Sequence, residues 1–416
     1  MRILLLGLNY APELTGIGKY SGEMMEWLAT RGHEIRVVTA PPYYPAWKVR
    51  EDYRWWAWRR EVSPAGVKIL RCPLWVPGSP GGISRLVHLT SFALSSLPAM
   101  IALSAWRPDV VITVEPTFFN APAALMAAAL GGAASWLHIQ DFEVDAAFEL
   151  GILPKRGAVH NLALQLERMA MQRFRHISSV SPTMLRRVAA KGVESASVVL
   201  LPNWVDTESV RPIAGPNRYR DELQVRPDQV LLLYSGNMGI KQGLEILPDL
   251  ARKLAHRKDL RFMFCGEGAF RPRMEELTRG MHNVSLLPLQ PSERLNEVLN
   301  AADIHLLPQR EDAADLVMPS KLTGMLASGR PTIATAAPGT QVAEALEGRG
   351  VVVPPGHPDQ LQHAVELLAQ DRDLRRRMGA AAREFAVKHL GRDEVLRRFE
   401  AEMKMLVQDA PEYSLT

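Results

Sequence analysis

Short apolar runs alternate with amphipathic stretches along the whole chain, and this alternation limits the possible folds more than any other feature. The runs have the length of strands, and the stretches between them have helical periodicity. In the first half we expect strands at 3–8, 35–39, 67–71, 110–114, 135–139, 178–180 and 198–201, and helices at 19–30, 86–105, 120–131 and 158–175. Strands joined by helices are typical of a parallel sheet covered on both faces.

The second half repeats this plan. It predicts strands at 230–235, 261–265, 284–287, 304–307, 332–334 and 351–353, helices at 243–256, 270–279, 291–301, 319–328 and 358–369, and a long charged helical stretch from 373 to about 408. Prolines and glycines cluster at the changeover, near 202–216. The sequence therefore predicts an α/β protein of two doubly wound domains, followed by a C-terminal helix that packs back on the first domain. Ligands of such sheets bind beyond the carboxyl ends of the strands.

Composition and charge exclude several classes of protein. The two cysteines, Cys72 and Cys265, lie far apart and form neither a disulfide framework nor a metal-type spacing with histidine, so we expect no metal, no cofactor and a cytoplasmic location. The apolar run that begins at Ile3 is too short for a secretion signal and is better explained as a first core strand. No dense basic stripe is present, so nucleic acid is not an expected partner.

The net charge of +4 arises from the first half of the chain, where residues 1–210 hold 21 Lys and Arg against 17 Asp and Glu. This excess could attract an anionic partner such as a phospholipid surface or a phosphorylated carrier, but simple scatter of charges is the preferred explanation.

The segment 306–335 predicts an anion site. Its apolar strand leads into a polar loop that ends at Pro319-Ser320-Lys321, and a short helix follows, which Gly329 can end. A helix that starts at the carboxyl edge of a parallel sheet directs free N–H groups, with about half a positive charge, toward a bound phosphate. Lys321 adds a full charge beside them.

Glycine-rich loops follow the first strand of each half. Gly16 and Gly18 precede the first helix, and Ser235-Gly236-Asn237 with Lys241 opens the second half, where Gly266-Glu267-Gly268 ends the next strand. Such glycines let a backbone approach a ligand closely, or simply permit a tight turn. A dinucleotide site is disfavoured because Gly16, Gly18 and Gly22 have the wrong spacing and no acidic residue ends the second strand.

Taken together, these motifs resemble the nucleotide-sugar glycosyltransferases of the retaining group four. The matching pieces, in chain order, are the Gly16/Gly18 loop, Leu201-Pro202-Asn203-Trp204-Val205-Asp206, Ser235-Gly236-Asn237, Cys265-Gly266-Glu267-Gly268, Ala302-Asp303 and Pro319-Ser320-Lys321 through Ala327-Ser328-Gly329-Arg330-Pro331. The chain is most similar to exopolysaccharide glycosyltransferases of the colanic acid type, through Asn9-Tyr10-Ala11-Pro12-Glu13, Thr39-Ala40-Pro41-Pro42-Tyr43-Tyr44-Pro45 and His138-Ile139-Gln140-Asp141-Phe142.

The resemblance implies two facing Rossmann-like domains of the GT-B type with an interdomain cleft. On this basis, residues 1–208 form an acceptor-binding domain, 209–385 a nucleotide-sugar-binding domain, and 386–416 a C-terminal helix and tail. It also implies transfer of a sugar, with fucose as a candidate, from a nucleotide-sugar donor to a lipid-linked or exopolysaccharide acceptor with retained configuration. The implied donor-binding residues are Gly16, Gly18, Gly236, Asn237, Lys241, Gly266, Glu267, Gly268, Ser320 and Lys321.

The chain departs from the family pattern at four positions. The two glutamates that the family usually has fall at Leu316 and Gly324, and its usual Arg and Lys fall at Asn237 and Gln242. Diphosphate binding must then depend on Lys241 and Lys321, with Arg310 as a weaker candidate. The residue that holds the ribose is left open.

Three residues are candidates for orienting the acceptor hydroxyl. His138 and Asp141 follow the fifth strand at its carboxyl end, and Glu115 follows the fourth, with Asp141 preferred. The alternatives are a hydrogen-bonded core histidine and acidic helix caps. No protein nucleophile is evident.

Residues 43–60 predict either contact with an anionic membrane or a loop folded on its own domain. They combine aromatic and basic side chains: Tyr43, Tyr44, Trp47, Tyr53, Trp55, Trp56, Trp58, Lys48, Arg50, Arg54, Arg59 and Arg60. The apolar stretch 86–105 is just long enough to cross a bilayer, but it occupies a helix position in the sheet plan. We therefore expect it to be buried or to lie at an interface, and the protein to work at the inner face of the plasma membrane.

Two other functions remain compatible with the sequence. One is a nucleotide-sugar 2-epimerase, which needs no acceptor. The other is a non-catalytic, membrane-docked assembly subunit, which the missing glutamates permit.

Overall fold

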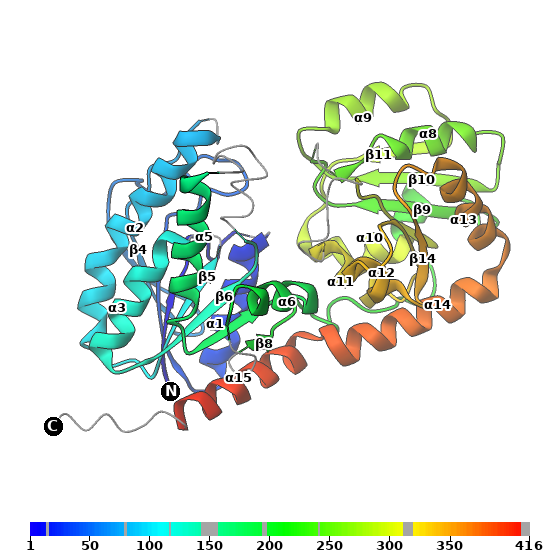
Figure 1. Ribbon diagram of the computed structural model, residues 1–416. Coiled ribbons are helices and arrows are strands. Elements are labelled where there is room, and N and C mark those ends of the chain that lie inside the picture. Colours follow the sequence, from blue (N-terminus) through cyan, green and yellow to red (C-terminus); the bar gives the residue numbers. More distant parts are fainter. Residues whose placement is uncertain are drawn as a thin grey trace. The chain divides into compact units, whose positions relative to one another are not determined.

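The computed structural model describes residues 1–13, 16–78, 81–115, 118–142, 157–193, 198–239, 242–310 and 319–408 (Figure 1). The chain forms two compact units. The N-terminal domain comprises Met1–Pro202 together with Leu396–Thr416, and the C-terminal domain comprises Asn203–Val395.

The N-terminal domain is built on one sheet with the strand order β3-β4-β2-β1-β5-β6-β7-β8. The strands are β1 (Arg2–Leu6), β2 (Glu34–Thr39), β3 (Arg59–Val62), β4 (Lys68–Arg71), β5 (Val110–Glu115), β6 (Ala134–Ile139), β7 (His176–Ser179) and β8 (Val198–Leu200). Every pairing is parallel except that of β3 with β4. The central strands β5 and β6 are buried at every residue, as expected for strands covered on both faces.

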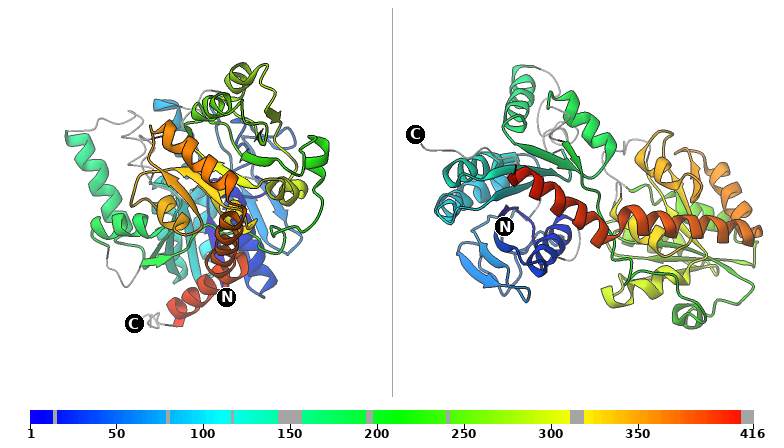
Figure 2. Two further views of the ribbon diagram at one scale, coloured as in Figure 1. Left: turned by 90° about the vertical axis from the view of Figure 1, so that its right-hand side faces the viewer. Right: turned by 90° about the horizontal axis from the view of Figure 1, so that it is seen from below.

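Helices cover both faces of this sheet. They are α1 (Gly16–Thr30), α2 (Gly82–Ser104), α3 (Ala121–Gly131), α5 (Ala158–Met171), α6 (Pro182–Ala190) and, from the end of the chain, α15 (Arg392–Gln408). Figure 2 shows α2 and α3 side by side on one face.

The C-terminal domain has a parallel sheet with the order β11-β10-β9-β12-β13-β14. Its strands are β9 (Val230–Ser235), β10 (Leu260–Cys265), β11 (Val284–Leu287), β12 (Ile304–Leu307), β13 (Thr332–Thr335) and β14 (Gly350–Val353). The chain order reverses direction between β9 and β12, and a crevice at such a switch point is where an open α/β sheet binds its ligand.

The helices of this domain fill the connections between strands. They are α7 (Arg218–Glu222), α8 (Ile246–Lys253), α9 (Arg271–Thr278), α10 (Leu295–Ala301), α11 (Ser320–Ala327), α12 (Gln341–Leu346), α13 (Pro358–Gln370) and α14 (Arg372–Phe385). Apolar side chains of α8, α9 and α13 pack with those of β9 and β10 into a single core cluster.

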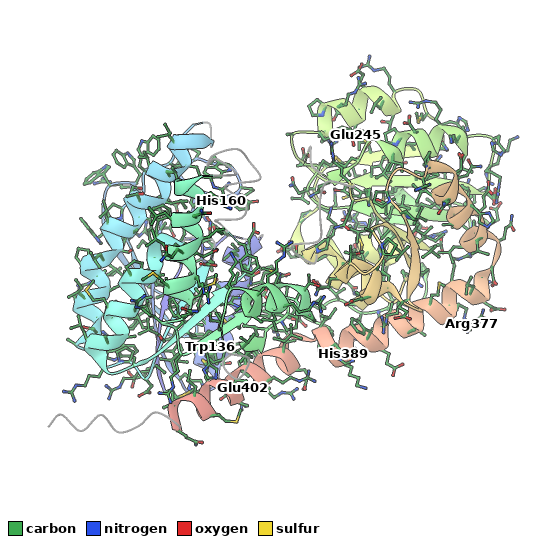
Figure 3. The ribbon with its side chains drawn as sticks, in the orientation of Figure 1. Trp136, His160, Glu245, Arg377, His389 and Glu402 are labelled. Atoms are coloured by element: carbon green, nitrogen blue, oxygen red, sulfur yellow. The ribbon has the colours of Figure 1, made fainter. Side chains whose placement is uncertain are left out.

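The C-terminal helix α15 packs on the N-terminal domain, as predicted. The ring of Phe399 meets that of Trp136 on β6 edge to face, with centroids 5.0 Å apart, and Figure 3 shows Trp136 and Glu402 on the two elements concerned. Glu400 is buried and lies 3.0 Å from His33 Nε2 and 2.6 Å from Lys404 Nζ. These two partners and Arg31 outweigh the effect of burial and lower the pKa of Glu400 to about 2.

The predicted alternation of strands and helices is confirmed in both halves, with three differences. The edge strand β3 was missed because Arg59-Arg60-Glu61-Val62 has no apolar alternation, and the helices α6, α7 and α12 were missed because they are short. The charged stretch after 373 is two helices rather than one. Gly391 is extended there, and Val205 pairs with the backbone on both sides of it, accepting from Arg392 N at 2.9 Å and donating to Leu390 O at 2.8 Å.

The docking of α15 can be tested with Phe399→Ala. Phe399 is 1% exposed, so its removal leaves a cavity and is expected to lower the free energy of unfolding by about 3–5 kcal/mol. Urea unfolding followed by tryptophan fluorescence measures the change. Met405→Ala is the matched control, because Met405 is 49% exposed on the same helix and should cost no more than about 0.5 kcal/mol. Equal effects of the two substitutions would contradict the packing.

Candidate active site

The loops after β9 and β10 are joined through their backbones at the carboxyl edge of the C-terminal sheet. Met238 N donates to Glu267 O at 2.7 Å, and Phe270 N donates to Met238 O at 2.8 Å. A Cβ atom on Gly266 would lie 1.9 Å from Gly236 O, and one on Gly268 would lie 2.5 Å from Met238 O. Only glycine fits at these two positions, so the predicted glycine motif serves first to bring the two loops into contact.

Lys321 lies at the start of α11 and reaches into this loop cluster. Its Nζ donates to Tyr234 Oη at 2.9 Å and to Gln242 Oε1 at 2.8 Å, and it lies 4.5 Å from the centroid of the Tyr234 ring. A Cβ on Gly236 would be 3.6 Å from the same amine. In the sequence, only the resemblance to the family linked Lys321 with the loop that contains Gly236. In the structure, the two are in contact.

The partners of Lys321 are neutral. Among the described residues it forms no ion pair, and burial lowers its pKa to about 7. A half-buried amine with neutral partners is well suited to bind an anion, because the anion restores the charge balance that burial has removed. The N–H groups at the start of α11 add a favourable dipole.

A cavity of about 610 Å³ lies at the same edge of the sheet, between the start of α8 and the ends of β12, β13 and β14. It is lined by Gly243, Glu245, Ile246, Gln309, Arg310, Thr335, Pro355 and Gly356. Two lining residues of the cavity are hydrogen-bonded to each other: the Thr335 hydroxyl accepts from Gln309 N at 2.7 Å and donates to Gln309 O at 2.8 Å. The volume falls in the range of small-molecule sites, about 300–1,000 Å³.

The remaining predicted donor-binding residues lie on these loops or in the other domain. Asn237, Glu267 and Ser320 are exposed, and Glu267 lies 3.5 Å from Arg271. Lys241 and Leu316 lie outside the described residues. Gly324, where the family usually has a glutamate, packs toward α10, because a Cβ there would be 3.3 Å from Leu299 Cδ1.

In the N-terminal domain, Gly16 and Gly18 open α1 beside a buried carboxylate that the sequence did not single out. Glu13 accepts hydrogen bonds from Tyr43 N at 3.1 Å, Tyr44 N at 3.0 Å and Asn9 Nδ2 at 2.9 Å. Burial raises the pKa of Glu13, and these donors oppose the rise. Gly18 is required because a Cβ there would be 2.6 Å from Glu13 Oε2.

The three predicted catalytic residues lie near the carboxyl ends of β5 and β6. His138 is buried, with Nδ1 2.9 Å from Ser178 Oγ and Nε2 2.9 Å from Gln140 Nε2, and burial lowers its pKa to about 4. It is therefore a neutral, fully bonded core residue, which fits a positioning role rather than proton transfer. Glu115 ends β5 and is 2% exposed, whereas Asp141 follows β6 and is only half-buried.

Comparison with known proteins identifies the family. Residues 15–204 match the model of the glycosyl transferase 4-like domain, and residues 217–385 match that of glycosyl transferases group 1. A relative in Escherichia coli K12, WcaI, named as a glycosyl transferase of colanic acid biosynthesis, is 41% identical over 96% of this chain and 98% of its own. The chain belongs to the GT4-type glycosyltransferases. The predicted family and the predicted enzyme class are thus confirmed.

Other matches agree with this glycosyltransferase fold. The sulfoquinovosyl transferase SQD2 of Arabidopsis thaliana is 30% identical over 48% of this chain and 39% of its own. Among solved structures, sucrose-phosphate synthase from Thermosynechococcus elongatus superposes with a TM-score of 0.76 at 18% identity, covering 98% of this chain and 99% of its own. HepE from Anabaena, solved with UDP and glucose, has a TM-score of 0.68 at 14% identity over 97% and 100% of the two chains.

The low pKa of Lys321 predicts that this glycosyltransferase takes up a proton when a nucleoside diphosphate binds. Above pH 7 the free amine is neutral, and an anion beside it raises its pKa again, so affinity should fall by up to tenfold per pH unit between pH 7.5 and 9. Calorimetry with UDP and GDP, in buffers of different ionisation enthalpy, measures both the affinity and the proton uptake.

Two variants make that measurement specific. Lys321→Gln should remove the pH dependence over this range, whereas Lys258→Gln, at an exposed lysine of the same domain, should leave it intact. An unchanged pH profile in Lys321→Gln would show that a different group titrates.

Proposed function

We propose that this glycosyltransferase moves a sugar from a nucleotide-sugar donor to a lipid-linked or exopolysaccharide acceptor, with retention of configuration at the sugar carbon. The amine of Lys321 is the observation that carries the proposal, because it is held at the switch point of the sheet with neutral partners. The complexes of HepE with UDP and with UDP-glucose support a nucleotide-linked donor. The name of the E. coli relative supports an exopolysaccharide product, and fucose is the first donor sugar to test.

The chemistry follows from where charge develops. As the bond between sugar and diphosphate breaks, the diphosphate gains negative charge and the sugar gains oxocarbenium character. Lys321 and the N–H groups at the start of α11 stabilise the departing diphosphate, and a group arranged in this way contributes on the order of 3 kcal/mol to the barrier. The acceptor hydroxyl attacks the same face of the sugar that the diphosphate leaves, so no protein nucleophile is required.

We assign the orientation of the acceptor hydroxyl to Asp141, which is half-buried at the carboxyl end of β6. His138 lies 2.9 Å from Gln140, the residue before Asp141, measured between Nε2 atoms, which suits a positioning role. Glu115 ends the neighbouring strand β5. Asp141 is preferred over these two because both of them are almost completely buried.

Contact with the inner face of the plasma membrane is the second part of the proposal. Trp55, Trp56 and Trp58 are each more than half exposed, at 53%, 56% and 56%. Several basic residues of 43–60 pair locally, such as Arg50 with Asp52 at 3.0 Å, but Arg54 and Arg60 form no ion pair among the described residues. Exposed indole rings beside unpaired guanidinium groups favour an anionic lipid surface.

Helix α2 supports this arrangement. It is long and apolar enough to cross a membrane, and 33% of its most apolar window is buried in the domain. One side packs inward through His88, Leu89, Phe92, Ser96 and Met100, while the other side exposes Ile83, Val87, Leu94 and Ile101. A helix with one packed and one exposed apolar side is suited to lie along a membrane surface.

Turnover tests the first part of the proposal. Lys321→Ala is expected to lower the rate at which nucleoside diphosphate is released from the donor about a hundredfold, while Lys258→Ala should keep the wild-type rate. The stereochemistry of the product is measured by NMR. Unchanged turnover in Lys321→Ala would refute the assignment, and a new sugar isomer formed from donor alone would indicate an epimerase.

Sedimentation with vesicles tests the second part. The triple variant Trp55→Ser, Trp56→Ser, Trp58→Ser should bind vesicles rich in phosphatidylglycerol at least tenfold more weakly, a change of about 1.4 kcal/mol. Leu289→Ser with Leu367→Ser, at residues 54% and 44% exposed in the C-terminal domain, is the control and should bind like the wild type. Equal loss in both variants, or none in the triple variant, would remove residues 43–60 from the interface.

A further inference from the structure

A small cavity in the N-terminal domain lies where three separate segments meet. Its volume is about 200 Å³, and it opens at the carboxyl end of β1. The lining comes from the β1–α1 connection (Leu8, Asn9, Gly16, Ile17), from the segment after β2 (Tyr43, Tyr44, Trp47) and from α2 (Arg85, His88, Leu89). This volume is smaller than the roughly 300–1,000 Å³ of a drug-sized site, and so suits one sugar ring rather than an oligosaccharide.

The wall formed by the segment after β2 is fixed in place by Glu13. The carboxylate accepts hydrogen bonds from the backbone N–H groups of Tyr43 and Tyr44 and from the side-chain amide of Asn9. These bonds join the two loops that face the cavity. Glu13 itself is 6% exposed and does not line the cavity. The cavity walls are therefore set before any ligand arrives, which reduces the ordering that binding requires.

One corner of the cavity is aromatic. The rings of Tyr43, Trp47 and His88 meet at centroid distances of 5.0–5.5 Å, and His88 Nδ1 lies 2.7 Å from Trp75 O. Trp47 has a φ of 51°, a conformation that costs a bulky residue energy and that tends to occur at ligand sites. Flat aromatic surfaces pack well against the C–H face of a sugar ring.

Arg85 is the permanent charge of the cavity. None of the lining residues is acidic, and among the described residues Arg85 forms no hydrogen bond and no ion pair. Burial lowers the pKa of His88, and the Arg85 guanidinium lowers it further, so His88 stays neutral. A guanidinium without a partner, in a cavity with aromatic walls, is matched to a phosphate group, which it can bind through two parallel hydrogen bonds.

We propose that this cavity is the acceptor subsite, and that it binds a single sugar ring whose phosphate pairs with Arg85. The inference rests on the proposed glycosyltransferase function and adds the chemical class of the acceptor, a sugar 1-phosphate or its diphosphate ester. Tyr44, which is 40% exposed, lines the cavity, and Trp75, which is 39% exposed, lies next to it because its carbonyl oxygen contacts His88 Nδ1. They give the lipid chain of a diphosphate ester an apolar surface, so a lipid-linked sugar is the expected ligand.

Calorimetry with the full-length protein tests the subsite without turnover. The probes are glucose 1-phosphate and galactose 1-phosphate, the two free hexoses, and a farnesyl diphosphate sugar in detergent. The wild type should bind at least one phosphorylated probe tenfold or more tightly than the free hexose. Arg85→Gln should abolish that preference and Arg85→Lys should keep part of it, while Arg186→Gln, at an exposed arginine of the same domain, should keep all of it. Tighter binding of the farnesyl ester than of the sugar phosphate would identify the lipid as the source of the phosphate, and equal binding would identify a free sugar phosphate.

The donor side of the reaction separates failure of this subsite from failure of the proposed function. Arg85→Gln should bind UDP or GDP like the wild type, because the amine proposed to bind the diphosphate, Lys321, is held by Tyr234 and Gln242. If the wild type shows no preference for phosphorylated sugars, or Arg85→Gln retains one, the subsite is refuted while donor turnover leaves the proposed function standing. If the wild type neither binds nor turns over any nucleotide sugar, the proposed function itself is refuted.

Discussion

The charge of a single half-buried amine, without a carboxylate to balance it, is the constraint on which the site in the C-terminal domain depends. Lys321 donates hydrogen bonds to Tyr234 and Gln242. Both acceptors are neutral, so neither balances the charge of the amine. Holding a cation away from water costs free energy, which an anionic ligand returns when it binds. The glycines of the β9 and β10 loops help to hold Lys321 in place, because Gly236 contacts Lys321 and is itself packed against Gly266.

The N-terminal domain uses the opposite arrangement. Glu13 is 6% exposed, but three N–H donors satisfy it, so it holds the two loops together and does not call for a ligand. Arg85, on α2, lines the nearby cavity and forms no ion pair among the described residues. A satisfied frame beside a cation that can pair with a phosphate therefore supports the proposed donor site in one domain and the proposed acceptor subsite in the other.

The sequence predicted most of the strands, their parallel arrangement and the position of Lys321 at a helix start, because each depends on local patterns: apolar runs, helix starts and glycine turns. It did not predict β3, whose four residues are mostly charged and pair at the sheet edge. It also missed Glu13, because the partners of Glu13 at Tyr43 and Tyr44 lie 30 and 31 residues away and no pattern links them. His138 was named as a catalytic candidate from its place after a strand, but burial, which the sequence does not show, leaves it neutral and bonded to Ser178 and Gln140.

The departures from the family pattern become consistent once the contacts of Gln242 are known. The family's usual lysine falls at this position, yet here Oε1 of Gln242 lies 2.8 Å from the Lys321 amine. Two ammonium groups about 4 Å apart near a protein surface repel each other by about 4 kcal/mol, so a charged lysine at 242 would destabilise Lys321 in its present place. Where the family usually has a second ammonium group, Gln242 instead provides an oxygen that accepts a hydrogen bond from Lys321. Among the described residues, the positive charge beside Tyr234 and Gln242 comes from Lys321, at the start of α11.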